Sequence, residues 1–177
     1  DLVTGVQTCA LPIYTHTMAA TAITKILLFN AGYCTGMDGS VRDYLLHGMR
    51  YLYSPKKVVN AVLHSIHQII ETESPDLCCF VEVRRIKRFI AKLWQYPFHA
   101  FENKYGKQSF LRYLPFFRKN SIGFFSAKHV PFQTHYFRHG TKKLIYEIRL
   151  ADNTSVLVSH FSLKASTRKK QFAEMKE

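Results

Sequence analysis

The chain is poor in acidic residues. Aspartate and glutamate number 12 against 25 lysines and arginines, which gives a formal net charge of +13 over 177 residues. This deficit favours a polyanionic partner, such as nucleic acid, an anionic membrane surface or a phosphate-bearing substrate. Because net charge does not reveal clustering, a basic protein that is merely kept soluble by its charge stays open as an alternative.

Cysteine is also scarce, with four residues in the whole chain. Cys9 and Cys34 are isolated, whereas Cys78 and Cys79 are adjacent, so on a strand they point to opposite faces. Neither arrangement has the spacing of a disulfide framework or of a zinc site. We therefore expect a reducing compartment, namely the cytoplasm.

Long apolar runs are missing as well. No segment approaches the roughly 20 apolar residues that a membrane-spanning helix needs, and no secretory signal is recognisable. The glycine-containing loop at residues 31–40 lacks the spacing of a phosphate-binding loop. The chain is nevertheless 47% hydrophobic and 14% aromatic, so we expect one ordered domain, present as a monomer, rather than a disordered segment.

The first residues do not continue into the pattern that follows. Residues 1–13 resemble the translated read-through of sequencing-adaptor sequence, and Met18 suits a natural start. We expect residues 1–17 to be a non-native leader, and the fold is argued from residue 18 onward.

Apolar runs and turn signals predict a mixed chain of strands and helices. A short apolar run at 23–29 ends at Asn30, and a second at 77–83 carries Glu82 in its sixth position. Between them, Ser54-Pro55 predicts the start of a helix, with Ser54 as its N-cap and Pro55 as its first residue. Apolar residues at helical spacing follow and stop at Ser74-Pro75. Strand, helix and strand form one crossover unit, so we expect two parallel neighbours whose ends, Asn30 and Glu82, share one edge of a sheet.

The second half of the chain reads mainly as antiparallel strands. Alternating residues and the turn at His139-Gly140 predict a hairpin. We expect core strands at 120–127, 133–138, 144–150 and 155–161, the last carrying His160, and a helix from Ser166 onward. Residues 84–94 combine basic and apolar residues at helical spacing, which predicts an amphipathic basic helix.

Three polar residues thus stand at the ends of core strands. A carboxylate near the end of a buried strand costs free energy unless it is paired or binds a metal, so Glu82 is a candidate ligand for Mg²⁺. Asn30 could support the metal or bind a phosphate oxygen, and His160 could act as an acid, a base or an electrostatic stabiliser. The simpler alternatives stay open: Asn30 caps a turn, Glu82 pairs with Arg84 or another cation, and His160 is a hydrogen-bonded core residue.

The order of these segments resembles the endonuclease/exonuclease/phosphatase superfamily, which includes the deoxyribonuclease-I-like enzymes. The segment Lys-Ile-Leu-Leu-Phe-Asn resembles the first strand of the family, which ends in its asparagine. Pro-Asp-Leu-Cys-Cys-Phe-Val-Glu-Val resembles the strand whose glutamate binds the metal, and Val-Leu-Val-Ser-His-Phe-Ser-Leu resembles the strand with the active-site histidine. The corresponding residues here are 25–30, 75–83 and 156–163, and 120–126 resembles a fourth strand of the family.

The resemblance implies a fold and an activity. The fold would be α/β in composition (α+β), a four-layer α/β/β/α sandwich of two mainly antiparallel sheets. The activity would be metal-dependent hydrolysis of a phosphoric ester, a phosphodiester above all, with Mg²⁺ or Mn²⁺ as cofactor. Glu82 and Asn30 would hold the metal, while Asn30 and His160 would bind the substrate and His160 would take part in catalysis. The charge favours nucleic acid as the substrate, and phospholipid or inositol phosphate also lies within the family's range.

Two departures from the family pattern matter. Ser159 and Phe161 replace the usual neighbours of the histidine, and the later Gly-Asp-x-Asn and Ser-Asp-His motifs do not occur in residues 161–177. We therefore expect residues 18–177 to be a C-terminally truncated domain that lacks the general base and has little activity by itself. The alternative is a non-catalytic basic nucleic-acid-binding module, or an inactive fragment, in which Glu82 is only an ion-pair partner.

Overall fold

The computed structural model describes residues 25–37, 40–51, 53, 55–84, 95–115, 117–150 and 154–176. The expected leader and most of the expected basic helix, residues 85–94, lie outside them. In chain order the elements are β1 (Ile26–Asn30), η1 (Gly32–Cys34), α1 (Val41–His47), η2 (Gly48–Tyr51), α2 (Lys56–Glu73), β2 (Leu77–Val83), β3 (Phe98–Asn103), η3 (Phe110–Tyr113), β4 (Ser121–Ser126), β5 (Phe132–Tyr136), β6 (Leu144–Arg149), β7 (Ser155–Ser159) and α4 (Ala165–Glu174).

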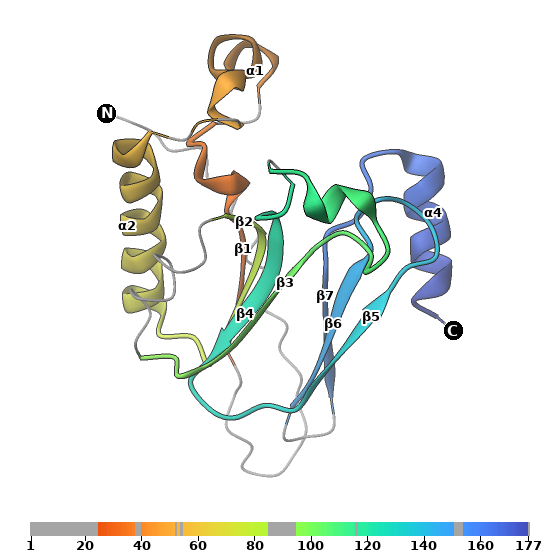
Figure 1. Ribbon diagram of the computed structural model, residues 1–177. Helices are drawn as coiled ribbons and strands as arrows, with labels where there is room; N and C mark the ends of the chain where they lie inside the picture. The colour runs from red at the N-terminus through yellow and green to blue at the C-terminus, as the bar shows by residue number, and fades with distance from the viewer. Residues whose placement is uncertain are drawn as a thin grey trace.

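The strands form two sheets, in the orders β1-β2-β4-β3 and β5-β6-β7. β1 and β2 are parallel, as the crossover unit predicts, and the other neighbouring pairs are antiparallel. Figure 1 shows the sheets side by side, with α2 on the outer side of the first and α4 beside the second. The fold is therefore an α+β sandwich of two mainly antiparallel sheets with helices outside, which confirms the expected architecture.

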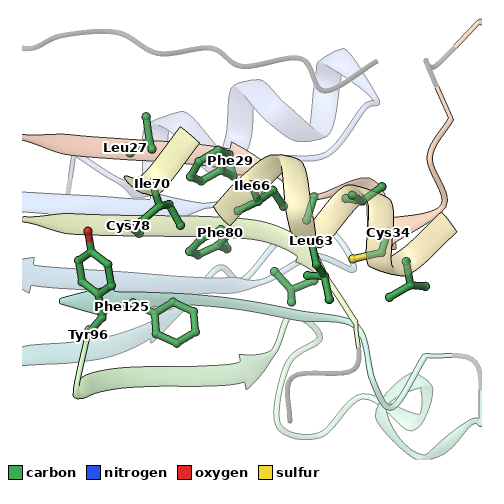
Figure 2. Packing of buried hydrophobic residues seen from close by; sticks show 14 residues of the cluster. Leu27, Phe29, Cys34, Leu63, Ile66, Ile70, Cys78, Phe80, Tyr96 and Phe125 are labelled. Carbon is green, nitrogen blue, oxygen red and sulfur yellow. The ribbon is translucent and has the colours of Figure 1, made fainter. Parts of the chain in front are cut away.

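Helix α2 packs on the outer face of the first sheet. Its buried residues recur at helical spacing, and Figure 2 shows Leu63, Ile66 and Ile70 against Phe29 and Phe80. The helix ends at Ser74, which adopts a left-handed conformation (φ 42°) and donates its backbone N–H to Ile70 O. Pro55 occupies the N-cap, so the expected cap at Ser54, which lies outside the described residues, was placed one residue too early.

A second apolar cluster fills the space between the two sheets. The first sheet contributes Leu77, Cys79, Val81, Ile122 and Phe124, and the second contributes Leu144, Tyr146, Ile148 and Val158. Cys78 belongs instead to the cluster beneath α2, so the two adjacent cysteines do point to opposite faces of β2. With both faces covered, β2 is buried along its whole length except at Glu82, which is half-buried.

Helix α4 is joined to the hairpin of β5 and β6 by a buried glutamine. Gln171 has no exposed surface; its amide nitrogen donates to the backbone oxygens of His139 and Lys142, at 3.2 and 3.0 Å. Its side-chain oxygen accepts a hydrogen bond of 2.9 Å from Ser162 N. Because three hydrogen bonds satisfy the amide, the helix fixes the backbone of the loop between β5 and β6 (residues 137–143, called the hairpin loop below).

Helix α1 was not expected from the sequence. Its N-cap, Ser40, accepts a hydrogen bond of 3.1 Å from Asp43 N, which is a standard start signal. Its apolar residues Val41 and Leu45 are exposed, so no periodic buried face marks it in the sequence. Among the described residues, no helix has the length and apolar character that crossing a bilayer requires.

Candidate functional site

Glu82 and His160 come together at one end of the sandwich. His160 directly follows β7 of the second sheet, and its Nε2 lies 3.4 Å from Glu82 Oε1 on β2 of the first. The two side chains are 14% and 17% exposed, so the contact is mostly buried but reaches the surface. We call this end of the sandwich the rim. The structure thus joins two of the three residues singled out from the sequence.

A β-bulge decides where Glu82 points. Phe80 pairs with Gly123 and Val83 with Ser121, so two residues of β2, Val81 and Glu82, stand opposite a single residue of β4. Strict alternation would direct Glu82 toward α2, because Phe80 lies in the cluster beneath that helix. The extra residue breaks the alternation, and Glu82 instead contacts a residue of the second sheet, while Val83 takes the place beneath α2.

Asn30 lies on the same edge of the first sheet. It ends β1 and pairs in register with Val81, the neighbour of Glu82. Its side-chain oxygen accepts a hydrogen bond of 3.0 Å from the backbone N–H of Gly32, so Asn30 does cap the turn that follows β1. A role for Asn30 toward a metal or a phosphate stays a prediction.

Two lysines that the sequence did not single out also lie at the rim. An isolated antiparallel bridge joins Tyr105 to Lys142, and Lys143 N donates to Lys104 O at 2.8 Å, so the backbone brings Lys104 and Lys142 together. Lys142 Nζ lies 2.9 Å from His160 Nε2 and 4.0 Å from Glu82 Oε1. Lys104 is only 3% exposed and donates to the Tyr33 hydroxyl.

A strained turn supports this cluster. In η1, Tyr33 and Cys34 have φ values of 55° and 56°, and Glu82 itself has a φ of 56°. A non-glycine residue in this left-handed region costs on the order of 1 kcal/mol or more. The turn places the Tyr33 ring 4.7 Å from Lys104 Nζ and 5.0 Å from the guanidinium carbon of Arg84. Strain is therefore concentrated where the cations gather.

The environment keeps His160 neutral. Burial, together with the charges of Lys142 and Lys104, lowers the pKa of His160 to about 3. Because the Lys142 ammonium can only donate, His160 Nε2 accepts its hydrogen bond and Nδ1 carries the proton. Nδ1 is buried and has no hydrogen-bond partner among the described residues. The contact between His160 and Glu82 is therefore one between a neutral imidazole and a carboxyl group.

Burial also lowers the pKa values of the two lysines at the rim. Burial, the charge of Lys142 and that of Arg84 lower the pKa of Lys104 to about 8, although Glu82 acts against this shift. Burial also lowers the pKa of Lys142, and Glu82 again opposes the shift. Tyr33 has a raised pKa because it is buried and faces Glu82. The rim therefore brings the ammonium groups of two partly or mostly buried lysines close to one carboxylate, Glu82.

The donor set at the rim bears on the Mg²⁺ that the resemblance implies. Over the described parts of the chain, no three His, Cys, Asp or Glu side chains converge into a metal-binding cluster. Mg²⁺ commonly binds through one or two carboxylates together with waters and substrate phosphate, so a single carboxylate that reaches the surface fits this ion and would not fit zinc. Glu82 can therefore serve as the protein ligand, in competition with the Lys142 ammonium.

The sequence contained a signal for one of the two missed lysines, Lys104. β3 runs parallel to β2, since both are antiparallel to β4, and Asn103 and Val83 both pair with Ser121. Lys104 directly follows β3 and so stands at the same strand end as Glu82. The rule that selected Asn30, Glu82 and His160 would have selected Lys104 had the strand at 98–103 been delimited.

Two solved structures are similar to this chain. No protein-family model matches the chain, and no curated protein does. Two crystal structures of TDP2 from Caenorhabditis elegans, one containing selenomethionine, are similar, with TM-scores of 0.47 and 0.46 and identities of 14% and 13%. Each match covers 69% of this chain and 36% of the TDP2 chain.

The chain spans little more than a third of the length of the TDP2 chains that it matches, 36%. The activity, substrate and partners of the whole protein therefore belong to the proposal below.

Proposed function

We propose that this chain forms the metal- and phosphate-binding part of a metal-dependent phosphoric-ester hydrolase of the endonuclease/exonuclease/phosphatase type. The observation that carries the proposal is the contact of Glu82 with His160, 3.4 Å apart at the rim. Each residue was singled out from a separate motif, and the motifs lie in different sheets. Phosphodiesters are the proposed substrates, and the net charge of +13 favours nucleic acid among them.

Glu82, His160 and Asn30 would have different roles in the proposed reaction. Glu82 would hold Mg²⁺, or Mn²⁺, and the ion would supply neutralisation of charge on the phosphate and on the leaving oxygen. His160 would bind the phosphate or exchange a proton with it through Nε2, which requires that Lys142 release this nitrogen and that the ring proton move there from the buried Nδ1. Asn30, which holds the turn after β1, would keep that edge of the site in place and reach the phosphate or the metal with its amide.

A calorimetric titration with Mg²⁺ tests the metal ligand. We expect the 177-residue chain to bind the ion and the Glu82→Gln variant to lose that binding. Glu147→Gln is the matched control, because Glu147 also contacts a histidine, His135 at 2.8 Å, but on the surface of the second sheet. Binding that survives Glu82→Gln, or that is lost equally in both variants, would remove Glu82 from the metal site.

The preference for nucleic acid has its own test. Binding to DNA through several phosphate contacts weakens steeply as salt rises, because condensed counterions are released. We expect the affinity for a short DNA duplex to fall by about tenfold or more between 50 and 200 mM salt. An affinity that does not change with salt would favour a small phosphate ester or a lipid head group as the substrate.

A second candidate function is a non-catalytic basic nucleic-acid-binding module. The position of Lys142 favours it, because an ammonium 4.0 Å from Glu82 Oε1 already provides the carboxylate with a partner. Under this alternative, Glu82→Gln leaves both the DNA affinity and its salt dependence unchanged and Mg²⁺ does not bind. The two measurements above therefore separate the module from the hydrolase.

A further inference from the structure

We propose that Lys104 and Lys142 form a subsite for a tetrahedral oxyanion, the phosphate group of the substrate, and that this subsite fills without a divalent cation. The inference rests on the proposed function only for the choice of phosphate as the natural anion. It assigns a binding role to two residues outside the motifs that suggested the function.

The first argument is the balance of charge. The two lysines and Arg84 lie around the Tyr33 ring or directly beside Glu82. Glu82 is the carboxylate whose charge acts on both lysines, and the cations act on one another unfavourably. A mostly buried group of like charges costs free energy unless an anion completes it. An oxyanion would balance the excess of the two lysines over Glu82.

The second argument is the construction of the site. Lysine is almost never fully buried without a compensating charge, yet Lys104 is 3% exposed. Its ammonium is held over two aromatic rings, 4.7 Å from the centre of Tyr33 and 5.3 Å from that of Tyr105. Lys142 is held by His160 on its side chain and by Gln171 on its backbone oxygen. Two cations fixed in this way have already lost the side-chain freedom that binding an anion would otherwise cost.

The third argument is access. Lys142, Glu82 and His160 are 18%, 17% and 14% exposed at their side chains, so the rim is open to solvent on the side of Lys142. An ammonium group has three donors, and the contact with His160 uses one of them. Lys142 can therefore donate to an incoming phosphate oxygen, and buried Lys104 adds its positive charge.

The test is phosphate binding in the presence of EDTA. Inorganic phosphate and, separately, sulfate are titrated into the 177-residue chain by calorimetry, with sodium chloride keeping the ionic strength constant. We expect both anions to bind and to raise the melting temperature, because a ligand that binds only the folded state stabilises it. Lys104→Met and Lys142→Met should each weaken binding about tenfold or more, the factor expected for one charge-assisted hydrogen bond.

The matched control is Lys128→Met. Lys128 is an exposed lysine that follows β4 at the opposite end of the first sheet, next to the Leu77 end of β2. The same change of side chain there should alter phosphate affinity by less than about twofold, because exposed charges at that separation are screened by salt. Equal losses in all three variants would mean general attraction by the positive surface, and the subsite would be wrong.

Two further outcomes decide between the subsite and the proposed function. Glu82→Gln should keep phosphate binding in EDTA and lose Mg²⁺ binding, the result that both proposals expect together. An unmodified chain that binds phosphate in EDTA but does not bind Mg²⁺ supports the subsite and counts against the hydrolase. No phosphate or sulfate binding by the unmodified chain overturns the subsite and leaves the hydrolase standing. If the methionine variants do not fold, reductive methylation of the unmodified chain replaces them: phosphate should slow modification of Lys142 and not of Lys128, and equal rates would contradict the proposal.

Discussion

The hairpin loop takes part in two contacts of glutamate with histidine that differ in their electrostatics. At the junction with α4, Glu174 accepts hydrogen bonds from the backbone N–H groups of Arg138 and His139, at 2.6 and 3.3 Å, and from the His139 ring. At the rim, Glu82 faces His160, and Lys142 of the same loop lies 2.9 Å from His160 Nε2 and 4.0 Å from Glu82 Oε1.

The two sites favour opposite charge states: a charged carboxylate at Glu174 and a neutral imidazole at His160. At the junction, burial raises the pKa of Glu174, but the hydrogen bonds from His139 and Arg138 outweigh it and the net shift is downward. At the rim, burial and two lysines lower the pKa of His160 to about 3. At the junction, the hydrogen bonds stabilise the Glu174 carboxylate and join α4 to the hairpin loop. At the rim, Lys104 and Lys142 lie near a single carboxylate, Glu82.

Glu82→Gln should produce the largest change. It removes the carboxylate from a group of mostly buried cations, and breaking such a pair typically costs about 3 kcal/mol of unfolding free energy. Urea denaturation at neutral pH measures the loss. Glu174→Gln serves as the comparison and should cost about 1 kcal/mol or less, because the amide oxygen of glutamine can still accept the backbone hydrogen bonds and no buried lysine loses its partner. Equal losses at the two sites would contradict the difference drawn between them.

Gln171→Leu should weaken both sites, because Gln171 holds the loop that they share. The leucine leaves the backbone oxygens of His139 and Lys142 and the N–H of Ser162 without their partner. Unsatisfied buried groups of this kind should cost about 2 kcal/mol in unfolding free energy. Gln108→Leu, at an exposed glutamine, is the control for the change of side chain. A cost no greater than that of the control would show that the loop does not depend on α4.

The bulge at the rim can be tested with a pair of variants. Glu82 has a φ of 56°, a conformation that glycine adopts without strain and alanine does not. Glu82→Gly should therefore be more stable than Glu82→Ala by about 1 kcal/mol, although glycine usually destabilises a strand. Urea denaturation of the two variants decides. A more stable alanine variant would mean that the strand pairs regularly and that Glu82 points toward α2.

The smallest expected effect is a pH dependence of the unfolding free energy through Glu174 at the junction. Because the folded-state pKa of Glu174 lies below its ordinary value of 4.5, its contribution to stability is present above that value and is lost as the pH falls through the lower, folded-state pKa. The unmodified chain should thus lose more stability between pH 6 and pH 3 than Glu174→Gln does. Parallel pH profiles for the two proteins would show that the hydrogen bonds to Glu174 do not favour its charged form.

The sequence predicted the strands of the rim better than its side chains. An apolar run bounded by Pro75-Asp76 marks β2 at its observed limits, and the crossover unit predicts the parallel pair of β1 and β2. The direction of Glu82 could not be predicted, because the extra residue appears only when β2 pairs with β4. The burial of Lys104 depends in part on Tyr33, which is distant in the sequence, so no local pattern predicts it.

The adjacent cysteines of β2 have a consequence for how openings of the molecule can be observed. Burial raises the pKa of Cys78 to about 12 and also raises that of Cys79, so neither thiol reacts readily in the folded state. Cys78 becomes accessible when α2 separates from the first sheet, and Cys79 becomes accessible when the two sheets separate. Rates of thiol labelling at these two neighbouring positions would therefore measure two different local unfolding reactions within one native chain.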